Sequence, residues 1–385
     1  MSDVAELLQR LVRIDTRNPP GNEIEAARML GGWLGDRGIA WSIDEFAPGR
    51  ANLFAEVRAT KPGRSIMFNT HTDVVPTGND WTHDPFSATL IDGVIWGRGA
   101  ADSKGSLAAM AIALARFAAR RDTFSGAVQL TAVADEEAHS RGAKRFLEQV
   151  QQRPDAVIVG EPTDLRLMAA HKGSLRPVIE IIGRASHAAL PQHGVNAIEG
   201  ASKLLSSLDG LREKVQAKAH PLVGSPTIVP VLIQGGEAPN MVPNRCRVTF
   251  DRRLVPGETE DAVIAQFKTW LEAFESSTEG YTARIVDLAP STGGPSETLP
   301  DHPFVIACQA GLAEIGLPTA LSGLVVNCDM SSFRAAGIPA VVCGPGSPDV
   351  MHARDEHITV AALERGVDAY ESMARQWLAG VGGVA

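Results

Sequence analysis

Several features that define whole classes of protein are missing from this sequence. Its four cysteines, Cys246, Cys308, Cys328 and Cys343, lie far apart and form no Cys-x-x-Cys pair, a usage typical of reduced, mostly buried thiols in a cytoplasm. No apolar run approaches the length of a membrane span. The N-terminal stretch MSDVAELLQRLVRID is amphipathic and lacks the basic start and apolar core of a signal peptide. We therefore predict a cytoplasmic protein with no membrane partner.

An excess of positive charge is also missing. The formal net charge is −9 and the isoelectric point is about 5.6, so the surface repels phosphate groups on average and nucleic acid is not an expected partner. The sequence shows no internal repeat and no low-complexity tract. With 385 residues the chain is too long for one ordinary core and suits two domains.

Strand and helix patterns alternate in the first part of the chain. Helices are predicted at residues 4–14, 23–37 and 103–119, and strands at 51–57, 65–68 and 127–133, followed by a helix through Phe146 and Val150 and the strand AVIVGEP. Such alternation predicts an α/β fold, in which a mostly parallel sheet is covered by helices on both faces. Right-handed crossovers then bring successive strand ends to one edge.

A different pattern begins near residue 175. It reads strand (177–183), helix (195–208), strand (226–234), strand (246–253), helix (258–274) and strand (281–288), which is the order of a ferredoxin-like α+β unit. The predicted organisation is a catalytic domain made of residues 1–174 and 290–385, interrupted by a lid domain of residues 175–289. A loop at 291–303, a helix at 304–316 and the strand AVVCGPG return the chain to the first sheet.

Metal-binding side chains lie at the predicted strand ends and at one helix start. They are His71, Asp102, Glu137, Glu161 and His352. Imidazole and carboxylate groups are the usual ligands of zinc and related ions in hydrolases, and two ions need one shared carboxylate plus two ligands each. Any one of these residues alone would more often be a solvated acid or a core histidine. Their common placement favours a site for two divalent metal ions.

Neighbouring acids suit supporting roles. Asp73 lies two residues from His71, so in an extended chain its carboxylate is expected to accept the other ring N–H of that histidine; a simple turn residue is the alternative. Glu136 and Glu137 are adjacent and point in different directions. Glu137 is then expected to bind metal, while Glu136 moves a proton from the metal-bound water to the leaving amine. A surface acidic pair is the alternative.

Two further patterns are less specific. GRGAADSKG offers Gly97 and Gly99 to a nucleotide, but Asp102 stands where a third glycine is expected and would repel a pyrophosphate. In the predicted lid, the alternation of CRVTFDRR leaves Arg253 free to meet a substrate carboxylate. A solvent-facing arginine is the alternative.

Nearly the whole chain resembles the M20 family of metallopeptidases. The resemblance rests on NTHTDVVPTG, WTHDPF, GRGAADSKG, ADEE, VGEPT, HKG, GRASHAALPQHGVNAIE, DRRLVPGE and GPGSPDVMHARDEHI. It is nearest to the acetylornithine deacetylase and succinyl-diaminopimelate desuccinylase branch. It implies two zinc ions, with Co²⁺ or Mn²⁺ as alternatives. One ion would be held by His71, Asp102 and Glu161, and the other by Asp102, Glu137 and His352, with Asp102 as the bridge.

The same resemblance implies roles for the other candidates. Asp73 would orient a metal ligand and Glu136 would be the general acid/base. His187 would stabilise the oxyanion in the partner subunit of a homodimer, while Asn240 and Arg253 would contact the substrate.

The expected function is that of a dinuclear zinc amidohydrolase that removes the acyl group from an N-acyl amino acid. One alternative is a dipeptidase or carboxypeptidase of the same family. Another is a catalytically silent relative that binds a small amidated molecule.

Overall fold

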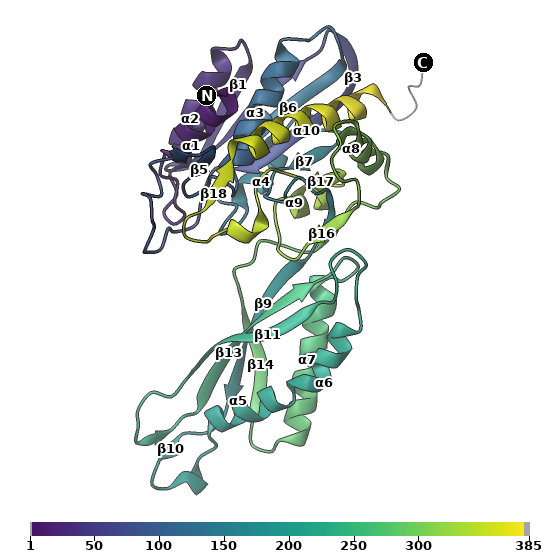
Figure 1. The fold of residues 1–385 in the computed structure, drawn as a ribbon. Coiled ribbons are helices and arrows are strands. Elements are labelled where there is room, and N and C mark those ends of the chain that lie inside the picture. Colours follow the sequence, from purple (N-terminus) through teal and green to yellow (C-terminus); the bar gives the residue numbers. More distant parts are fainter. Residues whose placement is uncertain (1, 381–385) are drawn as a thin grey trace. The chain divides into compact units, whose positions relative to one another are not determined.

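The computed structural model describes residues 2–380 (Figure 1). Contacts divide them into two compact units. Unit 1 contains the described residues up to Ala170, the segment Glu297–Gly323 and the described residues from Cys328 onward, whereas unit 2 contains His171–Ser296 and Leu324–Asn327. Unit 2 is thus an insertion in the chain of unit 1. That it acts as a lid, with limits at residues 175 and 289, stays a prediction.

Unit 1 is built on a mainly parallel sheet. Its strands are β1 (Ala40–Ala47), β2 (Arg50–Arg58), β3 (Lys61–His71), β6 (Ser125–Val133), β7 (Val157–Val159), β8 (Met168–His171), β15 (Ser296–Glu297), β16 (Ser322–Leu324) and β17 (Ala340–Val342). They lie in the order β1-β2-β6-β3-β7-β17-β8-β15, with β16 beside β8. The central strands β6, β3, β7 and β17 are parallel, while β1, β2 and β8 run antiparallel to their neighbours.

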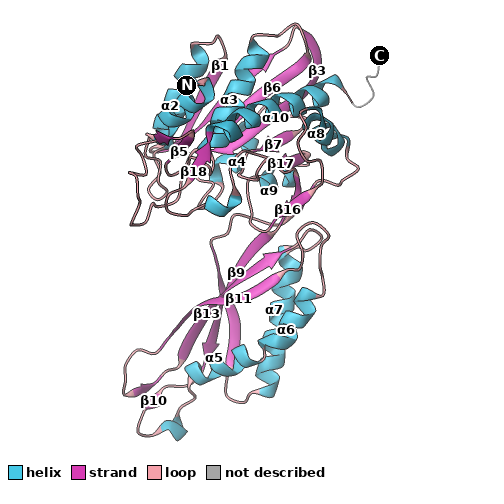
Figure 2. Ribbon diagram, in the orientation of Figure 1, coloured by secondary structure: helices cyan, strands magenta, loops and turns pink. Residues whose placement is uncertain are grey.

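Helices cover both faces of this sheet (Figure 2). One face carries α1 (Asp3–Val12), α2 (Glu23–Gly35), α3 (Lys104–Ala118), α8 (Pro303–Glu314) and α10 (Val360–Ala379), and the other carries α4 (Arg141–Gln149) and α9 (Met330–Ala335). The alternation of β2 shows the division. Leu53 and Ala55 belong to the core under the first group, whereas Phe54 between them stacks on Phe146 of α4 with ring centroids 5.9 Å apart. The predicted α/β class is confirmed.

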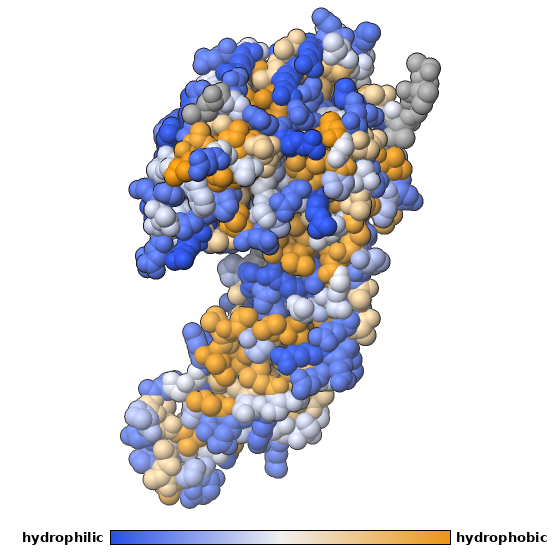
Figure 3. Space-filling view, in the orientation of Figure 1, coloured by the Kyte–Doolittle hydropathy of each residue, from blue (hydrophilic) through white to orange (hydrophobic). Residues whose placement is uncertain are grey.

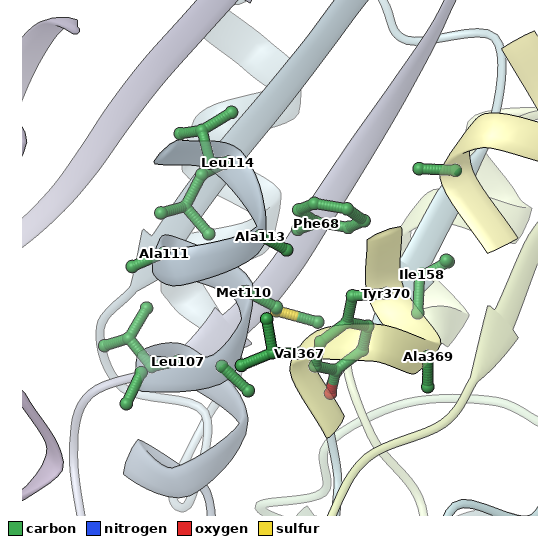
Figure 4. Packing of buried hydrophobic residues seen from close by; sticks show 14 of the residues in the cluster. Phe68, Leu107, Met110, Ala111, Ala113, Leu114, Ile158, Val367, Ala369 and Tyr370 are labelled. Carbon is green, nitrogen blue, oxygen red and sulfur yellow. The ribbon is translucent and has the colours of Figure 1, made fainter. Parts of the chain in front are cut away.

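The core beside the parallel strands fixes the start of α3. Figure 4 shows Phe68 of β3 close to Met110 of α3 and Tyr370 of α10, and the rings of Phe68 and Tyr370 lie 5.6 Å apart. The Tyr370 hydroxyl donates to the carbonyl oxygen of Cys343, at 2.9 Å. Small residues of α3 allow this close packing, and every residue from Lys104 to Met110 is buried. The helix that follows Asp102 is therefore held rigidly against the sheet.

Unit 2 has the strand order of a ferredoxin-like fold. Its sheet contains β9 (Gly173–Ile182), β11 (Thr227–Gly235), β13 (Arg245–Leu254) and β14 (Thr282–Ala289), in the order β11-β13-β9-β14, all antiparallel. The helices are α5 (Ala197–Ser206), α6 (Leu208–Gln216) and α7 (Glu260–Ser277), and their apolar sides share one core with the sheet. A short ribbon of β10 (Ser186–His187) and β12 (Met241–Val242) extends from it.

Smaller elements were not predicted from the sequence. A three-stranded sheet in unit 1 joins β4 (Thr89–Ile91), β5 (Val94–Trp96) and β18 (His357–Thr359). Two 3₁₀ turns, η1 (Pro191–His193) and η2 (Pro348–Val350), complete the elements. Among the described residues, no helix is both long and apolar enough to cross a membrane.

Candidate active site

The candidate residues of unit 1 gather at the carboxyl edge of its parallel strands. His71 is the last residue of β3, Glu137 follows the end of β6 by four positions, and Glu161 follows the end of β7 by two. Parallel strands place their carboxyl ends at one edge, where a cleft for ligands forms in α/β proteins. His352 reaches this edge from the loop after β17, and Asp102 from the loop before α3.

Asp102 lies between two imidazole rings. Its Oδ1 is 3.2 Å from Nε2 of His71, and its Oδ2 is 3.3 Å from Nε2 of His352. Each imidazole has a second carboxylate beside it. Glu161 Oε2 lies 3.7 Å from His71 Nε2, and Glu137 Oε2 lies 3.1 Å from His352 Nε2. Two groups of potential donor atoms that share Asp102 are therefore arranged around its two oxygens.

The donor atoms suit divalent cations. One atom each from His71, Asp102 and Glu137 can be chosen so that all lie within 4.8 Å of one another. Except for His352, which is about half exposed, these side chains are almost fully buried. Imidazole nitrogens and carboxylate oxygens at strand ends are a donor set that fits zinc or a related ion.

The pKa values of two carboxyl groups and both imidazole groups in this cluster are raised, so the cluster favours bound positive charge. Burial raises the pKa of Glu161 to about 7, and burial together with the charge of Asp102 raises that of Glu137 to about 7. Hydrogen bonds with Asp102 and Glu137 raise the pKa of His352 to about 10. Burial opposes protonation of His71, but the charge of Glu161 and the bond with Asp102 outweigh it and raise that pKa. Positive charge, on a protonated imidazole or on a bound cation, therefore stabilises the carboxylates of this cluster.

Asp73 positions the backbone of the two adjacent glutamates. Its Oδ1 and Oδ2 accept the N–H groups of Glu136 and Glu137, both at 3.1 Å. The predicted bond to His71 differs in its atoms, because the ring Nδ1 lies 2.9 Å from the carbonyl oxygen of Asp73 and 3.6 Å from its carboxylate. The same short segment thus orients His71 through its backbone and the glutamates through its side chain.

Glu136 belongs to the same acidic region. Its side chain is almost fully buried, and burial raises the pKa of its carboxyl well above the ordinary value, with the charge of Glu161 adding to the effect and that of His71 opposing it. Asp135, next to it, adopts a left-handed backbone with φ of 64°, a strained state for a residue other than glycine. Its carboxylate is held by Arg50 at 2.8 Å and by Asn18 at 2.9 Å. This network holds the turn that presents both glutamates.

Asp329 is an acidic residue of this region that sequence reasoning missed. It is fully buried, neither carboxylate oxygen has a hydrogen-bond partner among the described residues, and burial raises its pKa to about 7. Its charge acts on both Glu136 and Glu161. Asp329 follows β16 by five positions, but a three-residue strand is too short to be predicted from the sequence, so tertiary packing identifies this residue.

Three predicted site residues lie in unit 2. His187 pairs with Met241 in the β10-β12 ribbon, and the next residue, Ala188, donates its N–H to the Asn240 carbonyl oxygen at 2.9 Å. The side chains of His187 and Asn240 are both exposed, and the two residues lie close together. The β10-β12 ribbon precedes the start of β13, whereas Arg253 lies near the end of that strand. There its Nε donates to Asp251 Oδ1, at 2.7 Å. Unit 2 therefore brings His187 and Asn240 together and keeps Arg253 apart from them.

Fold and sequence together define the class of this protein, a hydrolase that acts on amide bonds. The chain belongs to peptidase family M20/M25/M40, whose profile matches residues 67–376. An acetylornithine deacetylase of Pectobacterium carotovorum subsp. carotovorum is 34% identical over 337 residues, covering 86% of this chain and 85% of that protein. Another, from Vibrio cholerae serotype O1, is 31% identical over 92% of this chain and 94% of its own.

Solved structures show the same fold. A tripeptidase from Staphylococcus aureus has a TM-score of 0.79 at 20% identity, with 97% of each chain covered. A Bacillus subtilis protein described as a dinuclear metal binding peptidase of the M20 family has a TM-score of 0.75 at 17% identity, with 98% of each chain covered.

Proposed function

We propose that this protein is a dinuclear, zinc-dependent amidohydrolase that removes the acyl group from an N-acyl amino acid, in the manner of an acetylornithine deacetylase. The observation that carries the proposal is the position of Asp102, with one oxygen toward His71 and the other toward His352. The curated relatives at 31 to 34% identity support the substrate class.

Two ligand sets follow from this arrangement. His71, Asp102 and Glu161 would hold one ion, and Asp102, Glu137 and His352 the other. Asp73, Glu136 and Asp329 add three more buried carboxyl groups. A single dication would leave most of these carboxylates uncompensated, and uncompensated buried charge is costly. Two divalent ions, zinc by preference and Co²⁺ or Mn²⁺ as alternatives, fit the charge of the site better.

Glu136 would be the proton carrier of the reaction. When bound, the ions would polarise the amide carbonyl and make a water molecule more acidic. Glu136 would accept the proton of the attacking water and deliver it to the nitrogen of the departing amine. Asp73 would keep Glu136 and Glu137 in separate orientations through their N–H groups. Adjacent residues can thus perform different tasks.

Unit 2 would complete the site in a homodimer. We propose that His187 stabilises the oxyanion in the partner's site and that Arg253 and Asn240 contact the substrate. A dimer is supported by the edge strand β11, where Val229, Leu232 and Ile233 are 48%, 60% and 56% exposed. Figure 3 shows an apolar patch where Figure 1 labels β11. An unpaired, apolar edge strand is suited to pairing with another strand.

The first experiment measures amine release from N-acetyl, N-succinyl and N-formyl amino acids and from dipeptides, with and without a chelator. Chelator-sensitive turnover of an acyl amino acid would support the proposal. Turnover of dipeptides alone would favour the dipeptidase or carboxypeptidase alternative. Two bound ions without any turnover would favour the silent relative.

We also propose that the protein acts in the cytoplasm. Its four cysteines are buried and form no disulfide, as is typical of proteins in a reducing compartment.

The role of His187 is tested by co-expressing His187→Ala and Glu136→Gln chains. If His187 acts across a dimer, a mixed dimer has one complete site, and random pairing restores roughly a quarter of the parent activity. If His187 acts within its own chain, mixing restores nothing. An active monomer in sedimentation would contradict this part of the proposal.

A further inference from the structure

Two chain segments that end in candidate metal ligands are joined by the small sheet of unit 1. β5 pairs antiparallel with β18, and Gly97 continues the pairing by donating its N–H to the carbonyl oxygen of Glu356, at 2.8 Å. Beyond this point one segment runs forward from Arg98 to Asp102. The other runs back from Glu356 to His352. The small sheet therefore brings both ligands to one place from far apart in the sequence.

The buried carboxylate of Glu356 binds the backbone next to Asp102. Its Oε1 accepts the N–H groups of Ala101, at 2.8 Å, and Asp102, at 2.9 Å. Its Oε2 accepts from Nη1 of Arg98, at 2.7 Å. Glu356 is 0% exposed and Arg98 is 1% exposed. The carboxylate thus fixes the direction in which the Asp102 side chain leaves the backbone.

The guanidinium of Arg98 reaches the other ligand. Its Nη2 donates to the carbonyl oxygen of His352, at 3.2 Å, and lies 3.4 Å from that of Pro76. The group also lies over the ring of Trp81, at 5.1 Å from the centroid. His352 itself lies in a loop, with φ of 58° and a half-exposed side chain. Arg98 is thus a buried anchor for a ligand that no helix or strand holds.

We propose that Arg98 and Glu356 are positioning residues. They would set the spacing of Asp102 and His352, which together with Glu137 form the second proposed ion site. This inference rests on the proposed metal site. Replacing a buried ion pair by apolar groups is often neutral for stability, so stability alone does not account for a charged pair here. Residues behind metal ligands fix ligand orientation, and their loss commonly weakens metal binding 10- to 100-fold.

The test is calorimetric titration of the metal-free Glu356→Gln protein with Zn²⁺. Glutamine has nearly the same shape and keeps an oxygen for the two N–H groups, but it leaves the Arg98 charge unpaired. We expect the affinity for at least one ion to fall 10- to 100-fold. When both proteins are loaded with cobalt in place of zinc, the visible spectrum of Glu356→Gln is expected to differ from that of the parent, because the ligand geometry differs.

Glu258→Gln is the matched control. Glu258 also accepts from a buried arginine, Arg252 Nη2 at 2.6 Å, and from a backbone N–H, that of Val255 at 3.2 Å, but in unit 2. This variant is expected to lose stability while keeping its zinc affinity. If Glu356→Gln does the same, with zinc affinity within two-fold of the parent, the proposal is overturned.

Arg98→Lys keeps the test decisive if Glu356→Gln does not fold. Lysine retains the charge facing Glu356 but lacks the fork that contacts both Glu356 and His352. Weaker zinc binding by the folded Arg98→Lys protein supports the proposal, and unchanged binding overturns it. A parent protein that itself binds no zinc would instead contradict the proposed function, so the two failures are distinguishable.

Discussion

His71 and His171 are both buried, and each is the last residue of a strand. In both rings Nδ1 lies 2.9 Å from the carbonyl oxygen of a nearby residue. The rings differ at Nε2. In His71 this atom faces Asp102 and Glu161, whereas in His171 it has no hydrogen-bond partner among the described residues.

The different surroundings of Nε2 shift the pKa values of the two histidines in opposite directions. Burial lowers the pKa of His171 to about 4, and the hydrogen bond with the Lys172 carbonyl oxygen only partly opposes this shift. The neighbouring carboxylates raise the pKa of His71 well above its ordinary value despite its burial. A buried strand-end histidine is therefore a candidate ligand only where acids surround its free nitrogen, and the tests below act on that difference.

Removal of Asp102 is expected to have the largest effect. Asp102→Ala deletes the carboxylate that faces both imidazoles, so both ions should be lost and kcat should fall by at least a factor on the order of 10³. Metal analysis and amine release measure the two effects. His171→Ala is the comparison variant and should retain both ions. Two tightly bound ions in Asp102→Ala would show that this carboxylate is no bridge.

Glu136→Gln separates catalysis from metal binding. We expect kcat to fall by about 10²- to 10⁴-fold while both ions remain bound, because the amide can no longer carry the proton. Glu148→Gln, on the exposed side of α4, is the control and should behave like the parent. Loss of an ion from Glu136→Gln would assign this residue to the ligands instead.

Strand-end reasoning located most of the residues around His71. Parallel strands share one edge, so apolar runs that stop near His71 and Glu161 predict from the sequence that these side chains lie close together. The adjacent glutamates after β6 followed the same rule. The alternation of strand and helix also predicted the sheet and its helical cover, because these depend on local patterns.

Other parts of the site depend on packing that local patterns do not encode. Glu356 meets Ala101 and Asp102 across more than 250 positions of sequence, and the three-residue strands of that small sheet are too short to show a period. Asp329 follows β16 by five positions, and this three-residue strand is too short to be predicted from the sequence. The carbonyl of Asp73, rather than its carboxylate, lies nearest to Nδ1 of His71. The free Nε2 of His171 is likewise visible only in three dimensions.

His171→Asn tests the other side of the comparison. Between pH 6.5 and 4 the unfolded chain binds a proton at this position and the folded chain does not, so folding stability falls with decreasing pH. The full loss is about 3 kcal/mol, reached below pH 4. The variant should lose about 3 kcal/mol less than the parent on acidification, measured by urea unfolding. His193→Asn, at an exposed site, should keep the acid dependence of the parent.

The pH dependence of metal binding tests the His71 side of the comparison. In the metal-free protein the pKa of Glu137 and of Glu161 is raised to about 7, and that of His352 to about 10. These groups must lose their protons to act as ligands, so binding releases protons and zinc affinity rises with pH.

Each released proton contributes about a tenfold change in affinity per pH unit. Zinc titrations at about pH 6, 7 and 8, each in two buffers of different ionisation enthalpy, count the protons directly. The count should fall when Glu161→Gln removes one of the titrating carboxyls, and should not change in His171→Asn. An affinity that is independent of pH would mean that the ligands are already deprotonated, and that the carboxylates around His71 are compensated by some other charge.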